Sequence, residues 1–302
     1  MKAIQIFVAI VCAAALAVAP LVQWGDLALL SSADGALAGY LALLGFGLLS
    51  ESLTLRFTVA RSAGQSSISF LPLLACIVLF GPAPTVLFMI TIGVVGEVLI
   101  RKKENIRAVF NVSQWTFAAT VGGLLYDSLG GQAVALVAGP DQASALLLQQ
   151  TPVFVAFGAA FMLLNHTAVS LAIALSQEMP FSRVIARVVG RSGVNVFYDL
   201  LLSPIAIALA YLYLAAGVAG LALFLLPMLA IRHAYQINLR LQEANRDLLK
   251  ALVTAIETRD PCTAGHSLRV SSLARRIPEA LGGPGGTAEV VETAALLHGV
   301  GR

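Results

Sequence analysis

Long apolar stretches separated by short polar segments fill the first 232 residues of the chain. A helix needs about 20 mainly apolar residues to cross a lipid bilayer. Eight stretches meet or approach that length, so the sequence predicts an all-α, polytopic membrane bundle of about eight transmembrane helices. They lie at 3–23, 35–52, 67–80, 84–100, 108–126, 151–175, 194–214 and 217–232.

Basic residues test this prediction because cytoplasmic loops collect lysine and arginine. With the N-terminus inside and eight crossings, every basic residue falls on the inner side. The opposite loops, at 24–34, 81–83, 127–150 and 215–216, contain no lysine or arginine. We therefore expect a multi-pass protein of the bacterial inner membrane with both termini in the cytoplasm. The inner group is Lys2, Arg56, Arg61, Arg101, Lys102, Lys103, Arg107, Arg183, Arg187, Arg191 and Arg232.

Composition agrees with a membrane protein. Hydrophobic residues make up 58% of the chain and charged residues 12%, whereas an ordinary globular chain is about one quarter charged. The three cysteines, Cys12, Cys76 and Cys262, form no CxxC pair, so the sequence predicts neither a disulfide framework nor a zinc site. No phosphate loop and no nucleic-acid motif stands out, and no nucleic-acid partner is expected.

The segment 177–193 is basic on one side. Arg183, Arg187 and Arg191 recur every four residues and therefore share one face of a short helix. Such a helix suits the surface of an anionic inner leaflet, which makes membrane lipid an expected partner.

The composition changes sharply at Arg232, where a charged helix without Gly or Pro begins and runs to 258. Its small and apolar residues alternate by three and four, which is a heptad seam. The seam predicts a homodimer through 234–255, and the alternative is an amphipathic helix that packs on its own domain. Its members are Ala234, Ile237, Leu241, Ala244, Leu248, Ala251 and Ala255.

Two motifs follow this helix. The first is the run AIETRDPCTAGHSLRV at 255–270, and the second is AALLHGVG at 294–301. In this order, with helical sequence between them, they resemble the start of an HD-GYP domain. That family is the cyclic di-GMP phosphodiesterase type within the HD superfamily of metal-dependent phosphohydrolases. The expected organisation is a sensor-like membrane domain at 1–231, a signalling helix at 232–258 and an incomplete HD-GYP-type domain at 259–302.

The resemblance implies a site of two or three divalent metal ions, Fe or Mn, inside a helical bundle. Carried over, its metal ligands map to His266 and His298, while the aspartate of the H-D pair falls on Gly299 and a following lysine on Arg302. The remaining family ligands would lie beyond Arg302.

A dinuclear centre needs bridging anions between its cations, and glycine provides none. We therefore expect this chain, as it stands, to be catalytically inactive and to hold metal weakly or not at all. A cyclic dinucleotide would be a partner only of a complete domain, where Arg302 is a weak candidate for phosphate contact.

Polar residues inside predicted spans are costly and usually face the bundle interior. They form a possible intramembrane ligand site, and the alternative is hydrogen bonding between helices. Near the inner ends, Glu97 and Asp199 would then pair with Arg101 and Arg191, with Asn111 joining them. Besides Glu97, the candidates are Asn111, Gln114, Asn165, His166, Asn195 and Asp199.

Three functions remain open on this sequence. The first is a membrane-bound signalling protein related to cyclic di-GMP phosphodiesterases. The second is a small-molecule transporter or permease with a vestigial cytoplasmic tail, which inverted repeats would favour, although no convincing repeat is visible. The third is a membrane scaffold without ligand or signal.

Overall fold

The computed structural model describes residues 2–33, 35–52, 55–59, 62–66, 70–137, 140–190, 203–257, 265–280 and 287–299. Contacts divide the chain into two compact units. The first comprises residues 1–54 and 67–225, and the second comprises residues 55–66 and 226–302.

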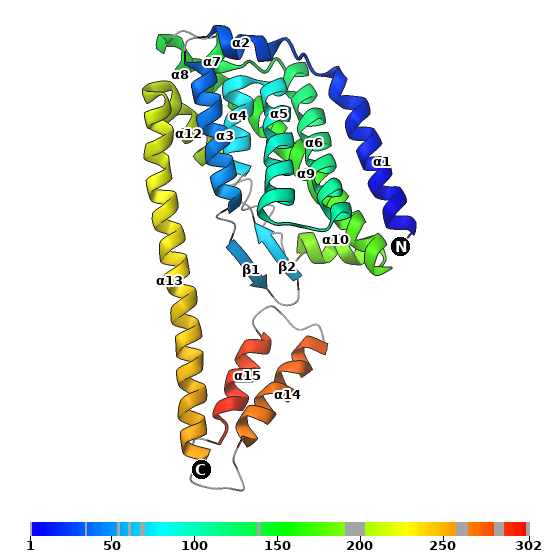
Figure 1. Ribbon diagram of the computed structural model, residues 1–302, viewed down its shortest axis with the longest axis vertical. Coiled ribbons are helices and arrows are strands. Elements are labelled where there is room, and N and C mark those ends of the chain that lie inside the picture. The colour runs from blue at the N-terminus through cyan, green and yellow to red at the C-terminus, as the bar shows by residue number, and fades with distance from the viewer. Residues whose placement is uncertain are drawn as a thin grey trace. The chain divides into compact units, whose positions relative to one another are not determined.

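The first unit is a helical bundle (Figure 1). Its described elements are helical throughout, as the apolar pattern predicted. They are α1 (Lys2–Val18), η1 (Ala19–Leu21), α2 (Asp26–Ser32), α3 (Ala36–Ser52), α4 (Phe70–Phe80), α5 (Pro82–Val94), η2 (Val95–Ile100), α6 (Asn105–Ser128), α7 (Val134–Val137), α8 (Pro140–Gln149), α9 (Thr151–Gln177), α10 (Phe181–Gly190), α12 (Ser203–Ala216) and the start of α13 (Val218–Glu257).

The predicted count of eight membrane spans needs correction. Among the described residues, three helical stretches are long and apolar enough to cross a bilayer, at Ala3–Leu21, Pro82–Ile100 and Thr151–Gln177. A fourth arises if α2 and α3, which meet at 111°, form one broken span.

The other predicted stretches are helical where they are described, but they fail for different physical reasons. Helix α4 has 11 residues and α12 has 14, which are too short at 1.5 Å per residue. The apolar part of α13 ends at Pro227. Helix α6 has 24 residues, but its asparagine, glutamine, serine and threonine side chains make it too polar to qualify.

Helix α4 lies at the centre of the bundle, and nearly all of its side chains are buried. Gly81 separates it from α5 with a positive φ of 82°, a conformation that favours glycine, and Pro82 begins α5 at a position where proline needs no hydrogen bond. Phe80 packs edge-on against Tyr40 of α3 and Tyr213 of α12. These rings tie three helices together at one end of the bundle.

The two ends of the bundle differ in charge. Figure 1 shows α2, α7 and α8 at one end, while α10 and the connection from η2 to α6 lie at the other. Asp26 and Asp127 belong to the first end, and Arg101, Lys102 and Arg183 to the second. The loops that the sequence assigned to opposite sides of the membrane therefore lie at opposite ends of this unit.

The second unit contains the charged part of α13, the helices α14 (His266–Ala280) and α15 (Thr287–Leu297), and a hairpin. Strands β1 (Leu55–Val59) and β2 (Ser62–Ser66) pair antiparallel, with Leu55 opposite Ser66 and Val59 opposite Ser62. The prediction of an all-α fold missed this hairpin, because a polar segment of 12 residues between two apolar stretches reads as a loop.

Helix α13 has 40 residues and is continuous from its apolar start into the charged segment. The sequence predicted this continuity, since no glycine follows Gly220 and only Pro227 interrupts the helical pattern. Helices α14 and α15 pack on each other. Their bounds match the two helices that the sequence placed on either side of the glycine-rich segment.

Candidate functional site

A buried network of charges joins α3, η2 and α6 near the basic end of the bundle. The side chains of Glu51 and Glu97 are almost completely buried. Arg101 faces both carboxylates, with Nη1 at 2.5 Å from Oε1 of Glu97 and Nη2 paired with Oε2 of Glu51. Lys103 adds a second cation, with Nζ at 2.9 Å from Oε2 of Glu97. Two anions and two cations therefore balance in a region where an uncompensated charge would be costly.

The amide of Asn111 completes the network, because its Nδ2 donates to Oε2 of Glu97 over 2.5 Å. This bond brings in α6 from across the bundle. The sequence offered two readings for Glu97 and Asn111, a ligand site or bonding between helices. The structure shows the second arrangement for this pair, including the contact of Glu97 with Arg101.

Local backbone geometry carries Glu97 into the network. Residues Val95–Ile100 form a π-helix at the end of α5, and such turns are frequent at functional sites. Gly96 leaves room for the neighbouring acid, since a Cβ there would lie 3.5 Å from Cγ of Glu51. The chain then turns at Lys102, whose φ is 48°, and this turn places Lys103 beside Glu97.

Sequence reasoning missed two members of this network, Glu51 and Lys103. Glu51 ends an apolar stretch, so it reads as a residue at the membrane boundary. Lys103 reads as one of several loop cations. Their pairing depends on how α3 and η2 lie together, and the sequence pattern does not contain that information.

A second polar contact lies deeper, between α6 and α9. Nε2 of Gln114 donates to Oδ1 of Asn165 over 2.9 Å. Gln114 is 2% exposed, and its Oε1 has no hydrogen-bond partner among the described residues. The same holds for the hydroxyl of Ser170 on α9, which the sequence analysis had not singled out.

The structure thus divides the predicted intramembrane candidates. Asn111 joins the charged network and Gln114 pairs with Asn165, while His166 lies on α9 beside Asn165. Asn195 and Asp199 fall outside the described residues, and so does Arg191.

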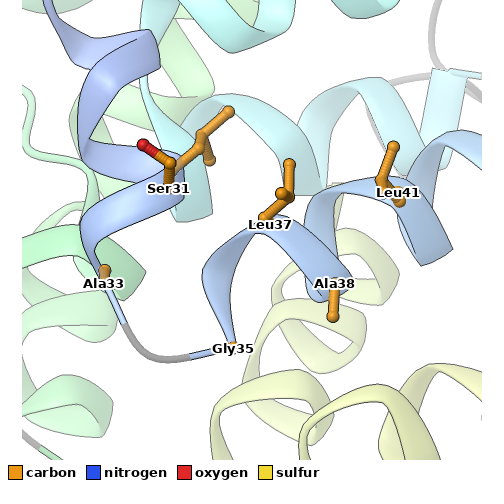
Figure 2. A pocket seen from close by; sticks show the side chains of 7 residues that line it. Ser31, Ala33, Gly35, Leu37, Ala38 and Leu41 are labelled. Carbon is orange, nitrogen blue, oxygen red and sulfur yellow. The ribbon is translucent and has the colours of Figure 1, made fainter.

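A hollow of about 400 Å³ lies at the corner between α2 and α3, close to the acidic end (Figure 2). Its described lining is mainly apolar, with Leu30, Leu37 and Leu41 among its members. The hydroxyl of Ser31 is its polar side chain and is already used, because it donates to the carbonyl of Ala28 over 2.8 Å. The hollow therefore lacks the convergent polar groups that orient a polar ligand.

The two histidines of the predicted metal site lie close together in the second unit. The ring centroids of His266, at the start of α14, and His298, just after α15, are 5.4 Å apart. Nδ1 of His298 is 2.7 Å from the carbonyl oxygen of Ala295. A ring that donates from Nδ1 presents Nε2 as the free lone pair, which is the usual arrangement of a metal-binding histidine.

The described residues nevertheless do not fit a dinuclear centre. Among residues 2–257, 265–280 and 287–299, apart from the short gaps, no three His, Cys, Asp or Glu side chains are grouped to hold a metal ion. Gly299 lies beside Ser267, whose Oγ would be 3.6 Å from a Cβ at that position. Two imidazoles without a bridging carboxylate cannot hold two cations together. Arg302 lies outside the described residues.

Glu257, the last residue of α13, reaches the same region. Its Oε1 accepts a hydrogen bond of 2.7 Å from the backbone N–H of Ser267, which is one of the unpaired donors in the first turn of α14. Hydrogen bonds from the Ser267 side chain and backbone hold the pKa of Glu257 below its ordinary value. The carboxylate thus caps the helix that begins with His266.

A pair of arginines adds a second link. Glu292 of α15 accepts from Arg246 of α13 and, over 2.6 Å, from Arg275 of α14. Partial burial raises the pKa of Glu292, but these two guanidinium groups outweigh it and leave the pKa below its ordinary value. Together with Glu257, they attach one side of α13 to the histidine-bearing pair of helices.

Comparison with known proteins identifies the membrane part. The MASE9 family model matches residues 36–235, which is 200 of 302 residues. The chain belongs to the MASE9 family, a family of membrane-associated sensor domains, and is a membrane-associated signalling protein. No curated protein and no solved structure matches the chain.

Proposed function

We propose that this chain is a membrane sensor that passes its signal through α13 to an HD-GYP-type phosphohydrolase segment. The observation that carries the proposal is the continuity of α13. One helix starts inside the MASE9 region, leaves it near residue 235, and ends at the carboxylate that caps α14. A shift or rotation of this helix would move the N-terminus of α14, and His266 with it.

The charge distribution supports a sidedness for the sensor. Exposed basic residues of the first unit gather at the end that holds α10 and the start of α6, and acidic residues lie at the other end. Lysine and arginine mark cytoplasmic loops. The proposed location is therefore the bacterial cytoplasmic membrane, with both ends of the chain and the phosphohydrolase segment on the cytoplasmic side.

The proposed signalling unit is a homodimer through 234–255. The heptad seam of α13 is exposed along its length in the described chain, and Ile237, Leu241 and Leu248 are each more than half exposed. Arg246 and Glu257, which hold α14 and α15, lie about 200° around the helix from the seam residues Leu248 and Ala255, at 100° per residue. The second unit therefore occupies the side of α13 opposite the seam and leaves the seam open for a second copy.

Disulfide formation tests this dimer. We expect Leu248→Cys, in a chain whose native cysteines are replaced by alanine, to cross-link in isolated membranes under mild oxidation. A disulfide needs Cα atoms within about 7 Å, which equivalent seam positions of a parallel pair satisfy. The measurement is the dimer fraction on a non-reducing gel.

Glu243→Cys is the matched control, because Glu243 is exposed and lies about 140° away from Leu248 around the helix. It should remain monomeric under the same oxidation. Equal yields at the two positions, or no dimer at Leu248→Cys, would contradict the seam.

The enzyme class rests on the resemblance of 255–270 and 294–301 to HD-GYP domains, and the adjacent histidine rings support it. The substrate class would be a cyclic dinucleotide, hydrolysed with the help of divalent metal ions such as Fe or Mn. Because Gly299 replaces the bridging aspartate, we propose that the residues present here do not hydrolyse it themselves.

The coding DNA after the Arg302 codon tests the class directly. The proposal expects a frame, continuous or resumed after a shift, that encodes further histidines, a late aspartate and a Gly-Tyr-Pro stretch. A downstream region without any of these would overturn the phosphohydrolase assignment. The sensor assignment would stand, since it rests on the membrane domain.

A further inference from the structure

Helix α10 is a short helix that follows α9 after a sharp change of direction. Glu178 ends α9 in the left-handed conformation, with φ of 53°, and Pro180 precedes the new helix. The ten residues of α10 extend about 15 Å, which is too short to cross a bilayer. The helix packs against α9 at the basic end of the bundle (Figure 1).

The two sides of α10 have different chemistry. Val184 is 3% exposed, so the apolar side of the first turn is covered by the bundle. Arg183 is exposed and has no ion pair among the described residues. Arg187 follows four residues later, so its position lies on the same side of the helix.

The surroundings reinforce this positive side. Lys102 and Arg107 are exposed at the same end of the bundle, and the buried carboxylates Glu51 and Glu97 are already balanced by Arg101 and Lys103. Phe181, at the start of α10, is exposed, and an aromatic ring beside basic residues is typical of a helix at the membrane surface. The charge of α10 therefore has no protein counterpart in the described part of this unit.

We propose that α10 binds the headgroups of anionic phospholipids through Arg183 and Arg187, which makes the sensor responsive to the surface charge of its membrane. Charge complementarity selects this partner. The protein lies in a bilayer, α10 lies at the end where the positive-inside rule places the anionic leaflet, and that leaflet attracts basic segments at its surface. The proposal extends the sensor role and needs neither the histidine pair nor the dimer.

Quenching of a fluorophore on α10 tests the proposal. The full chain carries a dye at Ser182→Cys, with Cys12, Cys76 and Cys262 replaced by alanine, in nanodiscs of phosphatidylcholine with a fraction of phosphatidylglycerol. A nitroxide is placed on the acyl chain of one lipid at a time, at equal mole fraction. We expect labelled phosphatidylglycerol to quench more strongly than labelled phosphatidylcholine, and we expect high salt to remove the difference.

The double variant Arg183→Gln/Arg187→Gln should reduce this preference by up to roughly fivefold for each arginine removed. The control Arg240→Gln/Lys250→Gln removes the same charge from α13, beginning about 20 Å past Pro227, and should keep the preference. Quenching by labelled phosphatidylcholine shows that each variant is inserted.

Three results would overturn the proposal. Equal quenching by the two lipids in the unaltered helix would show that α10 does not select anionic headgroups. An unchanged preference in the arginine variant would assign the selection to other residues. Loss of the preference on adding inorganic phosphate at matched ionic strength would indicate a site for the free ion instead of a lipid surface.

Discussion

Replacement of Arg101 by alanine should destabilise the membrane domain strongly. The guanidinium faces both Glu51 and Glu97, whose side chains are 2% and 0% exposed. Removing one partner of a buried ion pair typically costs about 3–5 kcal/mol, because the remaining charge stays buried without compensation. Lys103 still balances Glu97, so the excess negative charge falls mainly on Glu51. We expect a clear fall in the unfolding midpoint of the purified protein in detergent.

Arg107→Ala is the matched control. Its side chain is 73% exposed and pairs with Glu104 at 3.4 Å. Exposed pairs of this kind contribute about 0–1 kcal/mol. Equal shifts of the unfolding midpoint for Arg101→Ala and Arg107→Ala would show that the buried network does not hold α3, η2 and α6 together.

A second variant separates charge from packing. If the cost of Arg101→Ala comes from an uncompensated carboxylate, then Glu51→Gln in the same chain should recover part of it. The double variant would then lose less than the sum of the two single losses. Strictly additive losses would instead assign the effect of Arg101 to the packing of its aliphatic stem.

The apolar pattern predicted the helices well because each helix must bury or embed its own apolar residues. Helix α9 and the stretch Pro82–Ile100 qualify as spans for this reason. The same pattern overcounted the spans, because a buried helix and a lipid-facing helix look alike in sequence. Helix α4, with 11 residues enclosed by neighbouring helices, shows the limit of that reasoning.

The candidate sites were predicted only where the information is local. Arg101 follows Glu97 by four residues, so their pairing can be read from helical spacing. Glu51 joins them from 46 residues earlier, and Glu257 reaches Ser267 across a turn. Those contacts depend on the packing of one helix on another. For the histidine pair, the order of the two motifs gave the expectation, and the pairing of α14 with α15 brings the rings together.

The turn between α12 and α13 leads to the second large effect, because α13 begins there. Gly217 has a positive φ of 60°, and its N–H donates to the carbonyl of Tyr213 over 2.6 Å. Gly220 then approaches the preceding helix so closely that a Cβ would lie 2.0 Å from the carbonyl oxygen of Leu212. The obstructing atoms belong to the backbone, so a side-chain rotation cannot relieve the clash.

Gly220→Ala should therefore force α12 and α13 apart and lower the unfolding midpoint by at least the about 1–3 kcal/mol of a typical overpacked site. The control is Gly45→Ala in the interior of α3, where a Cβ would meet nothing within 4 Å. Alanine there should stabilise the helix by about 0.5–1 kcal/mol, so the two substitutions are expected to differ in sign. A stabilising effect of Gly220→Ala would contradict the close approach. If this turn also fixes the rotation of α13, Gly220→Ala should reduce disulfide formation at Leu248→Cys, and Gly45→Ala should leave it unchanged.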